Sequence, residues 1–514
     1  MVRSLFDICL TTICRHRLAE GISYLPAESK EKLLEYFTSH DMLSTPNCMQ
    51  VLTAGFSIDI ECLTFYLSED VTDDLLRTIV KSCTSLKEIS IIDCPNVTDQ
   101  GILDITLNQP DLYSVELRYL RNLSSNGLKN IKSRYLDVVD LSGCSRITSE
   151  GIFDLVYNNR SIKKLNLSNC RDLDDQALYD IAYCIGENLE TIELDCLPNM
   201  LDPATTLHDL SHKCPNISQL SLCRFFGAER ENDVLSEYEI AGSVLREIDL
   251  YGNYFVHLPK LPPTIKTIRL SVTGCEDVEE LVRKLESHEE LCDLHLQLEC
   301  LDEDTWLVEA ANRFLTHFLS HLGPKITRLH ISACRIVDPV MALITEALPH
   351  LTDLALSCLH LNTYYLRKFF SGGINSKGAK LKSLKLKGLR ITYRALFTIG
   401  KGARSLTDLE ASHMATVDDR FLVLIADTCK HIRSVNFNGC RFVTDKGLSA
   451  LASNGNLSEV RIRGTGCTDT FIYRLAAHCP QMEWIAHADF SGRPRFSQQA
   501  LQFLRDTCIQ RVIC

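Results

Sequence analysis

The sequence predicts an α/β solenoid, in which short units of one strand and one helix stack in a single row. A pattern of apolar residues, clearest at 432–448 (IRSVNFNGCRFVTDKGL), recurs along most of the chain, for example at 86–101, 136–151 and 162–175. Most copies begin 24 to 28 residues apart, which suits one strand and one helix. One such unit cannot bury its own apolar side chains, so neighbouring units must stack.

Each unit is expected to open with a strand and to continue into a helix. In the copy at 432–448, Val435 and Phe437 lie two residues apart, the spacing of a strand that buries one face. Cys440 follows three residues later, where we expect the strand to end and the small side chain to turn inward toward the neighbouring unit. Thr444 and Asp445 then predict a helix start, with Thr or Asp as the N-cap.

This pattern resembles the leucine-rich repeat of the cysteine-containing type. The resemblance implies a horseshoe-shaped solenoid with helical N- and C-terminal caps. We expect a helical region at 1–50 that binds an adaptor or caps the array, repeats over 51–490, and a C-terminal cap at 491–514. The first apolar residues of the units are Ile60, Leu86, Leu112, Leu136, Ile162, Leu189, Ile217, Leu245, Ile265, Leu291, Ile326, Leu351, Leu381, Leu406, Ile432, Leu457 and Met482.

Charge and cysteine usage restrict the class of protein. The formal net charge of −12, without a basic tract, argues against a nucleic-acid binder. Many of the 23 cysteines occupy equivalent positions of the repeat: Cys94, Cys144, Cys170, Cys334 and Cys440 at the strand end, and Cys83, Cys214, Cys429 and Cys479 before the unit begins. Such periodic cysteines indicate buried thiols, and the absence of any C-x-x-C pair makes a zinc site unexpected. We therefore expect a reducing compartment, cytosol or nucleus, and no metal or cofactor.

The amino terminus does not suggest export. No apolar run approaches the length of a membrane helix. The apolar start LFDICLTTIC is interrupted by Asp7, and no small-residue cleavage site follows.

Residues 1–50 lie outside the repeat and predict two amphipathic helices. Leu5, Cys9 and Ile13 share one face of the first, and Pro26 precedes a second helix with Leu33, Leu34, Phe37 and Leu43 facing inward. One explanation is a helical pair that covers the open end of the first repeat.

A second explanation rests on resemblance. Ser4-Leu5-x-x-x-Cys9-x-x-x-Ile13 resembles the elongin-C-binding box, a helix whose apolar anchors enter a pocket of the partner. Leu25-Pro26-x-x-Ser29-x-x-x-Leu33 resembles the cullin-contacting box that follows it, although Ser29 stands where an aliphatic residue is usual.

Together with the repeats, these boxes resemble the Zyg-eleven/Zer family of substrate receptors of cullin-two ubiquitin ligases. That family implies elongin C binding through Leu5, Cys9 and Ile13, and a cullin contact through Pro26 and Leu33. The resemblance covers the first fifty residues and, loosely, the repeats. It ends in the C-terminal half, where the family has armadillo-type repeats, so its substrate pocket is not carried over.

The segment LPAESKEKLLEYF also resembles the opening of an F-box, which would imply a Skp-type adaptor. The segment after Tyr36 lacks the usual V-C-x-x-W ending. Both resemblances imply a ubiquitin-ligase receptor, and a plain repeat scaffold is the remaining alternative.

Several stretches depart from the regular repeat. An insertion follows Cys223, and prolines near 258–263 predict an extended connection in place of a helix. Phe225, Phe226, Tyr251, Tyr254 and Phe255 either fill this irregular core or form an exposed partner anchor. Further on, we expect longer helices at 305–322 and 361–370, a mobile loop at 371–380, and a closing helix after Met482.

Sequence motifs give no support for catalysis, because the common phosphate-binding, hydrolase and zincin signatures are absent. We therefore expect a non-catalytic binding protein. The outward strand positions include acidic residues in early units, such as Asp137, Asp140, Glu190 and Glu193. Later units carry cations and a tryptophan there, which predict a surface for an acidic substrate segment: Arg269, Arg328, Lys382, Lys385, Arg433, Arg461 and Trp484.

Overall fold

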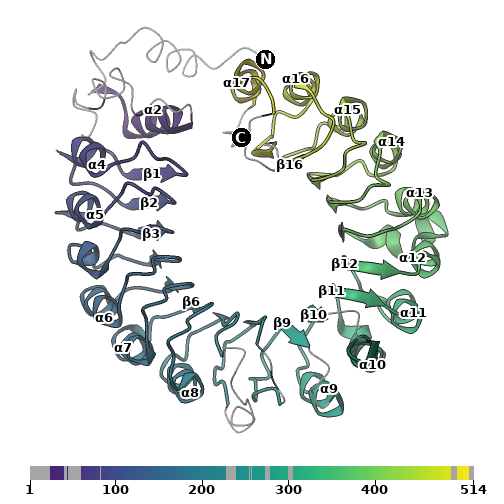
Figure 1. The fold of residues 1–514 in the computed structure, drawn as a ribbon, viewed down its shortest axis with the longest axis horizontal. Helices are drawn as coiled ribbons and strands as arrows, with labels where there is room; N and C mark the ends of the chain where they lie inside the picture. Colours follow the sequence, from purple (N-terminus) through teal and green to yellow (C-terminus); the bar gives the residue numbers. More distant parts are fainter. Residues whose placement is uncertain are drawn as a thin grey trace. The chain divides into compact units, whose positions relative to one another are not determined.

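The structure is a computed structural model that describes residues 24–39, 43, 52, 59–81, 83–226, 239–253, 255, 257–272, 278–298, 305–487 and 495–508. The described residues form two compact units, one before Arg269 and one from Arg269 onward. Within each unit the strands lie on the inner side and the helices on the outer side (Figure 1). Each of the 17 predicted repeats has a strand that begins two residues after its first apolar residue. The prediction of an α/β solenoid is confirmed.

The N-terminal unit holds the first eight strands. In chain order its elements are α2 (Ala27–Ser39), β1 (Cys62–Tyr66), α4 (Asp73–Val80), β2 (Glu88–Ile92), α5 (Asp99–Thr106), β3 (Ser114–Arg118), η2 (Ser125–Leu128), β4 (Val138–Asp140), α6 (Ser149–Asn158), β5 (Lys164–Asn166), α7 (Asp175–Ile185), β6 (Thr191–Glu193), α8 (Pro203–Lys213), β7 (Gln219–Ser221) and β8 (Glu247–Leu250). The boundary between the units falls within β9 (Thr267–Val272).

The C-terminal unit continues the same alternation. Its elements are α9 (Val278–Glu286), β10 (Asp293–Leu298), α10 (Thr305–Leu322), η4 (Gly323–Lys325), β11 (Arg328–Ile336), α11 (Asp338–Glu346), β12 (Asp353–Leu361), α12 (Thr363–Phe370), η5 (Gly373–Asn375), η6 (Lys377–Lys380), β13 (Ser383–Lys387), α13 (Tyr393–Gly402), β14 (Asp408–Glu410), α14 (Asp419–Thr428), β15 (Ser434–Asn436), α15 (Asp445–Ala452), β16 (Glu459–Arg461), α16 (Asp469–His478), β17 (Trp484–Ala486) and α17 (Gln498–Thr507).

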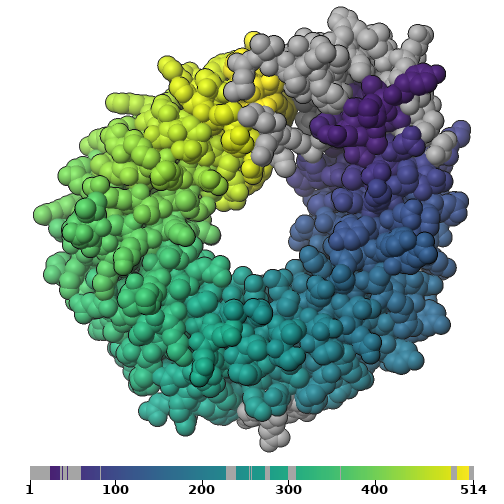
Figure 2. All heavy atoms as spheres, turned by 180° about the vertical axis from the view of Figure 1, so that it is seen from behind, coloured from purple at the N-terminus to yellow at the C-terminus, as the bar shows by residue number. Residues whose placement is uncertain are grey.

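Successive strands pair in parallel and in the same register of the repeat. Leu63 lies opposite Ile89, for example, and Leu409 opposite Val435. These central strand residues are at most 2% exposed and pack against the helices. The residues on either side of them face away from the helices. Because the register never slips, each outward position forms a continuous row across neighbouring strands. In Figure 2 the atoms of successive repeats form a continuous surface within each unit.

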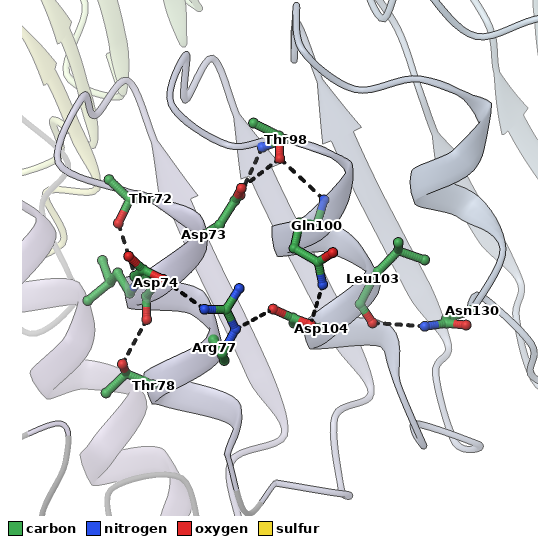
Figure 3. A network of polar contacts seen from close by, with 11 residues as sticks. Thr72, Asp73, Asp74, Arg77, Thr78, Thr98, Gln100, Leu103, Asp104 and Asn130 are labelled. Carbon is green, nitrogen blue, oxygen red and sulfur yellow. Dashed lines mark hydrogen bonds and ion pairs between the residues drawn. The ribbon is translucent and has the colours of Figure 1, made fainter.

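An aspartate in the first helical turn links each of several repeats to the next (Figure 3). The Asp73 carboxylate accepts hydrogen bonds from the Thr98 backbone N–H at 2.9 Å and from the Thr98 hydroxyl at 2.6 Å. Asp419 makes the same two bonds to Thr444, at 2.8 and 2.6 Å. The sequence predicted either Thr or Asp as the N-cap, and in these two repeats the N-cap is the threonine.

The contact between successive repeats also explains the glycine of the motif Asp-x-Gly. Gly447 lies so close to the preceding repeat that an added Cβ would stand 2.6 Å from Asp419 Oδ1 and 2.9 Å from Asp419 Cα. The Gly447 N–H also donates to Asp419 Oδ1 at 3.1 Å. Glycine is therefore required at this helix position by the distance between repeats.

The strand-end cysteines tie their repeat to the preceding one, as the sequence predicts. Cys144 Sγ donates to the Leu117 carbonyl at 3.0 Å, and Cys440 Sγ donates to the Ala411 carbonyl at 2.9 Å. Burial raises the pKa of Cys144 to about 12. Cys334 is an exception. It is only half-buried and lies within β11, so the prediction that it ends a strand is wrong.

A left-handed residue seven positions after the first apolar residue ends most strands. Asn169 has φ 61°, His413 has φ 56° and Gly439 has φ 75°. Asn and Gly adopt this conformation at little cost. The corresponding residues at the longer strands are Ala333 in β11 and Cys358 in β12, neither of which turns, so both strands run for nine residues.

The irregular stretches are packed rather than exposed. Phe225, Phe226 and Phe255 are at most 5% exposed, and Phe226 makes edge contacts with the other two rings. The proposed aromatic anchor is therefore wrong for these three; Tyr251 is half-buried and Tyr254 lies outside the described residues. The described residues between β8 and β9 contain no helix, as the prolines predicted. The segment 371–380 is not an open loop, because it forms η5 and η6 and buries Ser376 and Gly378.

Candidate binding surfaces

The N-terminal boxes are described only in part. Leu5, Cys9 and Ile13 lie outside the described residues. Pro26 is exposed immediately before α2, whereas Leu33 is 0% exposed and packs inward with Leu34, Phe37 and Leu43. The inward face predicted for this helix is confirmed. Leu33 offers no surface to a cullin in this position.

Helix α2 covers the open edge of the first repeat. The Glu31 carboxylate accepts hydrogen bonds from the backbone N–H groups of Glu61 and Cys62, both at 2.9 Å. Among the described residues of the N-terminal unit no strand precedes β1 to satisfy these donors, and an unpaired edge invites association with other chains. A capping role for the whole region 1–50 stays a prediction. At the other end, α17 packs beside α16 as the predicted closing helix.

Of the cations predicted to bind an acidic segment, four lie in strands and two, Lys382 and Arg433, come immediately before a strand. They also differ in their neighbours. Arg328 pairs with the buried Asp293 at 2.9 Å, and half of its side chain stays exposed. Arg461 stacks on the Trp484 ring, with its guanidinium carbon 4.5 Å from the ring centroid, and also contacts Glu459 at 3.5 Å. These residues already have partners. The predicted surface is therefore not a uniform cationic row.

The four other cations of this set differ in their exposure. Arg269 is half-buried in β9, where it lies close enough to His330 to affect its charge. Arg433 is exposed beside Asp408 at the rim of a hollow of about 420 Å³. Lys382 is exposed immediately before β13, and Lys385 is exposed at its centre.

Two histidines stack on the strand face between these cations. The rings of His295 and His330 lie 3.8 Å apart between centroids, in adjacent strands and matching positions. His295 Nε2 lies 3.0 Å from the Asp293 carboxylate. Burial lowers the pKa of His330 to about 4, and the nearby charges of His295, Lys385 and Arg269 act in the same direction. The sequence analysis overlooked this pair, which appears only when the strands are aligned in register.

The strand face of the N-terminal unit is acidic, as the sequence predicted. Asn166 donates to both Asp140 and Glu193, at 3.3 and 2.8 Å, and joins three neighbouring strands. Burial raises the pKa of Glu193, and the nearby Asp195 and Asp140 add to the effect. The expected acidic residues are thus brought together across β4 to β6.

A second hollow, of about 610 Å³, lies where α13, α14 and α15 begin. Tyr393, Arg420 and Phe442 line it, and the Arg420 guanidinium lies over the Tyr393 ring at 4.3 Å. Phe442 is 64% exposed. Neither the aromatic residues nor their place at this edge was predicted as a site.

Comparison with known proteins agrees with the repeat. Residues 158–182 and 428–452 match the sequence model described as "Leucine Rich repeat". The chain carries leucine-rich repeats. A search of curated proteins found no match. No catalytic family is indicated by these results.

Several solved structures are similar in architecture. The yeast Rad7–Elc1 complex has a chain that is 14% identical, with coverage of 99% of this chain and 98% of that chain and a TM-score of 0.37. A chain of the mouse RP105/MD-1 complex is 15% identical, with coverage of 88% and 74% and a TM-score of 0.40. An internalin of Listeria monocytogenes is 13% identical, with coverage of 81% and 94% and a TM-score of 0.31. Similarity at this level carries no information about partners.

The repeats therefore form a protein-binding scaffold of the leucine-rich-repeat type. Among the described residues, no group of three or more His, Cys, Asp or Glu side chains could hold a metal ion. Within the same part of the chain, no helix is both long and apolar enough to span a membrane.

Proposed function

We propose that this protein is the substrate-recognition subunit of a cullin-RING ubiquitin ligase that binds elongin C through Leu5, Cys9 and Ile13. The strand faces of the repeats would hold the substrate near a ubiquitin-loaded partner, so the chain contributes proximity and makes no bond itself. We place the protein in the cytosol or nucleus, as the thiol content suggests.

Elongin C binding, the first part of the proposal, is supported by the contact between helix α2 and the first repeat. Helix α2 covers the first repeat with Leu33, Leu34 and Phe37, and Glu31 satisfies the strand edge. Helix α2 thus already covers the edge of β1. That leaves the spaced anchors of the box in need of another explanation, and recognition of a helix in a partner's groove supplies one.

The cullin contact needs a different set of residues from the one that the resemblance implies. Leu33 is buried, whereas Tyr24 is 91% exposed and Pro26 is exposed beside it. We infer that a cullin bound to this region would contact Tyr24 and Pro26. Leu33, which is buried, would instead stabilise α2.

A pull-down of the purified chain with elongin B–C, in parallel with a Skp-type adaptor, tests the proposal. We expect wild type to capture elongin B–C and Leu5→Ser/Cys9→Ser to lose it. Thr11→Ala, on the opposite side of the predicted helix, is the matched control and should bind as wild type. Capture of the Skp-type adaptor alone would favour the F-box alternative, and capture of neither would leave a repeat scaffold.

A further inference from the structure

The outward face of β11, β12 and β13 combines exposed cations, free hydroxyl groups and a short central side chain. We call this set the lysine–serine face, and it consists of Ser332, Ala355, Ser357, Lys385 and Lys387. All five residues belong to the C-terminal unit. They alternate with the buried leucines and isoleucines of the same strands, so their side chains point away from the helices.

The strand register places these residues in two adjacent rows. Ala355 lies opposite His330 on one side and Lys385 on the other. Ser357 lies opposite Ser332 on one side and Lys387 on the other. Neighbouring strands are about 4.8 Å apart, so His330 and Lys385 stand roughly 10 Å from each other. Ala355, whose side chain is a single methyl group, is the residue between them.

The two lysines form no ion pair with the carboxylates nearest to them in the described part of the chain. Both are exposed, and neither has an ion pair in the described part of the chain. Glu410 lies opposite Lys385 in the register, but its carboxylate accepts from the Ser412 hydroxyl at 2.8 Å. Asp353, two residues before Ala355, accepts from the Thr352 hydroxyl at 2.6 Å. The two ammonium groups are therefore available to an incoming anion.

The serine hydroxyl groups of the second row are also available. Neither the Ser332 nor the Ser357 hydroxyl has a hydrogen-bond partner among the described residues, in contrast to that of Ser412, which donates to Glu410. Each hydroxyl can donate one hydrogen bond. Ser332 and Lys387 lie on either side of Ser357, so all three residues of the second row carry a hydrogen-bond donor.

The charge state of the neighbouring histidine is consistent with a positive local field. Burial is the main cause of the lowered pKa of His330, and Lys385 and Arg269 contribute in the same direction. His330 is thus neutral at pH 7, so the cationic character of the lysine–serine face comes from the lysines.

We propose that the lysine–serine face binds a phosphorylated serine or threonine side chain of a partner protein. A phosphoryl group carries a charge near −2 and has three acceptor oxygens, which match two ammonium groups and the serine hydroxyls. A single carboxylate would satisfy fewer of these donors. The inference rests on the proposed function in one respect only: it names the class of substrate segment that the repeats hold.

Binding of short degenerate peptides to the full chain, measured by fluorescence anisotropy, tests this proposal. The probes are one pool with a fixed central phosphoserine, one with serine and one with glutamate. We expect the phosphoserine pool to bind about ten-fold or more tightly than the serine pool, with affinity falling as salt increases. Equal binding of the phosphoserine and glutamate pools would overturn the phosphate assignment, as would no binding of the phosphoserine pool.

Charge-matched variants locate the site. Lys385→Gln/Lys387→Gln should weaken binding of the phosphoserine pool about ten-fold or more. Lys401→Gln/Lys446→Gln removes two exposed lysines from the helices and should bind as wild type. A folded Lys385→Gln/Lys387→Gln protein with wild-type affinity would overturn the proposal.

A second pair of variants guards against loss of folding. Ala355→Glu places a carboxylate at the centre of the lysine–serine face and should abolish binding, whereas Ala355→Gln, of similar size, should retain more of it. Equal loss in both would show that size and not charge decides, and would contradict the proposal. Because these residues are far in sequence from the elongin-type box, capture of elongin B–C should be unchanged in all of these variants, so the two proposals fail separately.

Discussion

At the scale of single residues, contacts between successive repeats explain the recurring letters of the motif. Asp419 and Gly447 are 28 residues apart, yet the carboxylate of one and the backbone of the other are in hydrogen-bond contact. In several repeats the threonine before the helix donates two hydrogen bonds, from its backbone N–H and its hydroxyl, to the aspartate of the preceding repeat. The motif thus encodes a link between neighbours in addition to the start of a helix.

Replacement of Asp419 by alanine should destabilise the protein. The change removes acceptors for the Thr444 N–H, the Thr444 hydroxyl and the Gly447 N–H, and we expect a loss of roughly 1–3 kcal/mol in the free energy of unfolding. Urea denaturation measures it. Asp427→Ala, an exposed aspartate later in α14, is the control and should change the free energy little. Equal effects of the two substitutions would contradict the role of Asp419.

Gly447→Ala should also destabilise, although alanine normally favours a helix by about 1 kcal/mol over glycine. The added methyl group would lie 2.9 Å from the backbone Cα of Asp419, so the two repeats would have to separate. Ser449→Ala in the same helix α15 lacks this conflict and should be neutral or stabilising. Thermal unfolding of both variants measures the difference, and a stabilised Gly447→Ala protein would refute the close approach.

At the scale of secondary-structure elements, strand ends and helix covers decide which surfaces are open. The left-handed residue after most strands turns the chain toward its helix, and its replacement by Ala333 and Cys358 lets β11 and β12 extend. Extension enlarges the outward face at that place. The cover α2 has the opposite effect, because it closes the edge of β1.

Glu31→Ala should expose that edge. Without the carboxylate, the N–H groups of Glu61 and Cys62 lose their acceptor, and we expect their hydrogen exchange to accelerate roughly ten-fold. Glu28→Ala breaks only an exposed pair with Lys32 and should leave those two amides unchanged. If exchange at Glu61 and Cys62 did not respond to Glu31→Ala, α2 would not be the cover of this strand.

The paired strands β10 and β11 should make stability depend on pH. Burial together with His295, Lys385 and Arg269 lowers the pKa of His330 to about 4, against the opposing effect of Asp293. The unfolded chain binds a proton at His330 near pH 6.5, whereas the folded chain does not until about pH 4. Folding stability should therefore fall as the pH falls from about 6.5 to about 4.

Urea denaturation at several pH values between these limits measures this dependence. His330→Gln should make stability less dependent on pH in this window, and substitution of the exposed His431 by Gln is the matched control. An unchanged pH profile in His330→Gln would contradict a neutral His330 in the folded state.

At the scale of the whole molecule, each repeat contacts mainly its neighbours, so stability depends on local interfaces along the row. All 17 described cysteines are free thiols, and 11 of them are buried. Burial raises the pKa of Cys144 to about 12 and that of Cys440 to about 11, which leaves almost no thiolate at neutral pH. Buried thiols in both units can therefore report unfolding.

Alkylation during urea denaturation, read at each cysteine by mass spectrometry, should resolve the two units. We expect Cys144 and Cys170 to become reactive together, and Cys440 and Cys479 to form a second set with a different midpoint. The reason is that the described residues divide into two compact units, and a repeat is stabilised mainly by its neighbours. The half-buried Cys292 should react earlier than either set. One common midpoint for both sets would refute independent units.

The sequence by itself determined the repeat, the start of every strand and the inward face of α2. Those features depend on the spacing of apolar residues, which is local information. It also indicated which residues point outward, because side chains alternate along a strand. The sequence did not predict that 371–380 would fold into short helices or that β11 would continue through Cys334. Both features depend on the packing of neighbouring repeats.

The tertiary structure alone decided which outward residues meet. Arg328 and Asp293, or His295 and His330, are separated by 35 residues in sequence and come together only because parallel strands align in register. The same alignment leaves Lys385 and Lys387 without an ion pair among the described residues. Composition predicts a charged face, but a binding site depends on which of its charges remain unpaired, and that is a property of contacts between repeats.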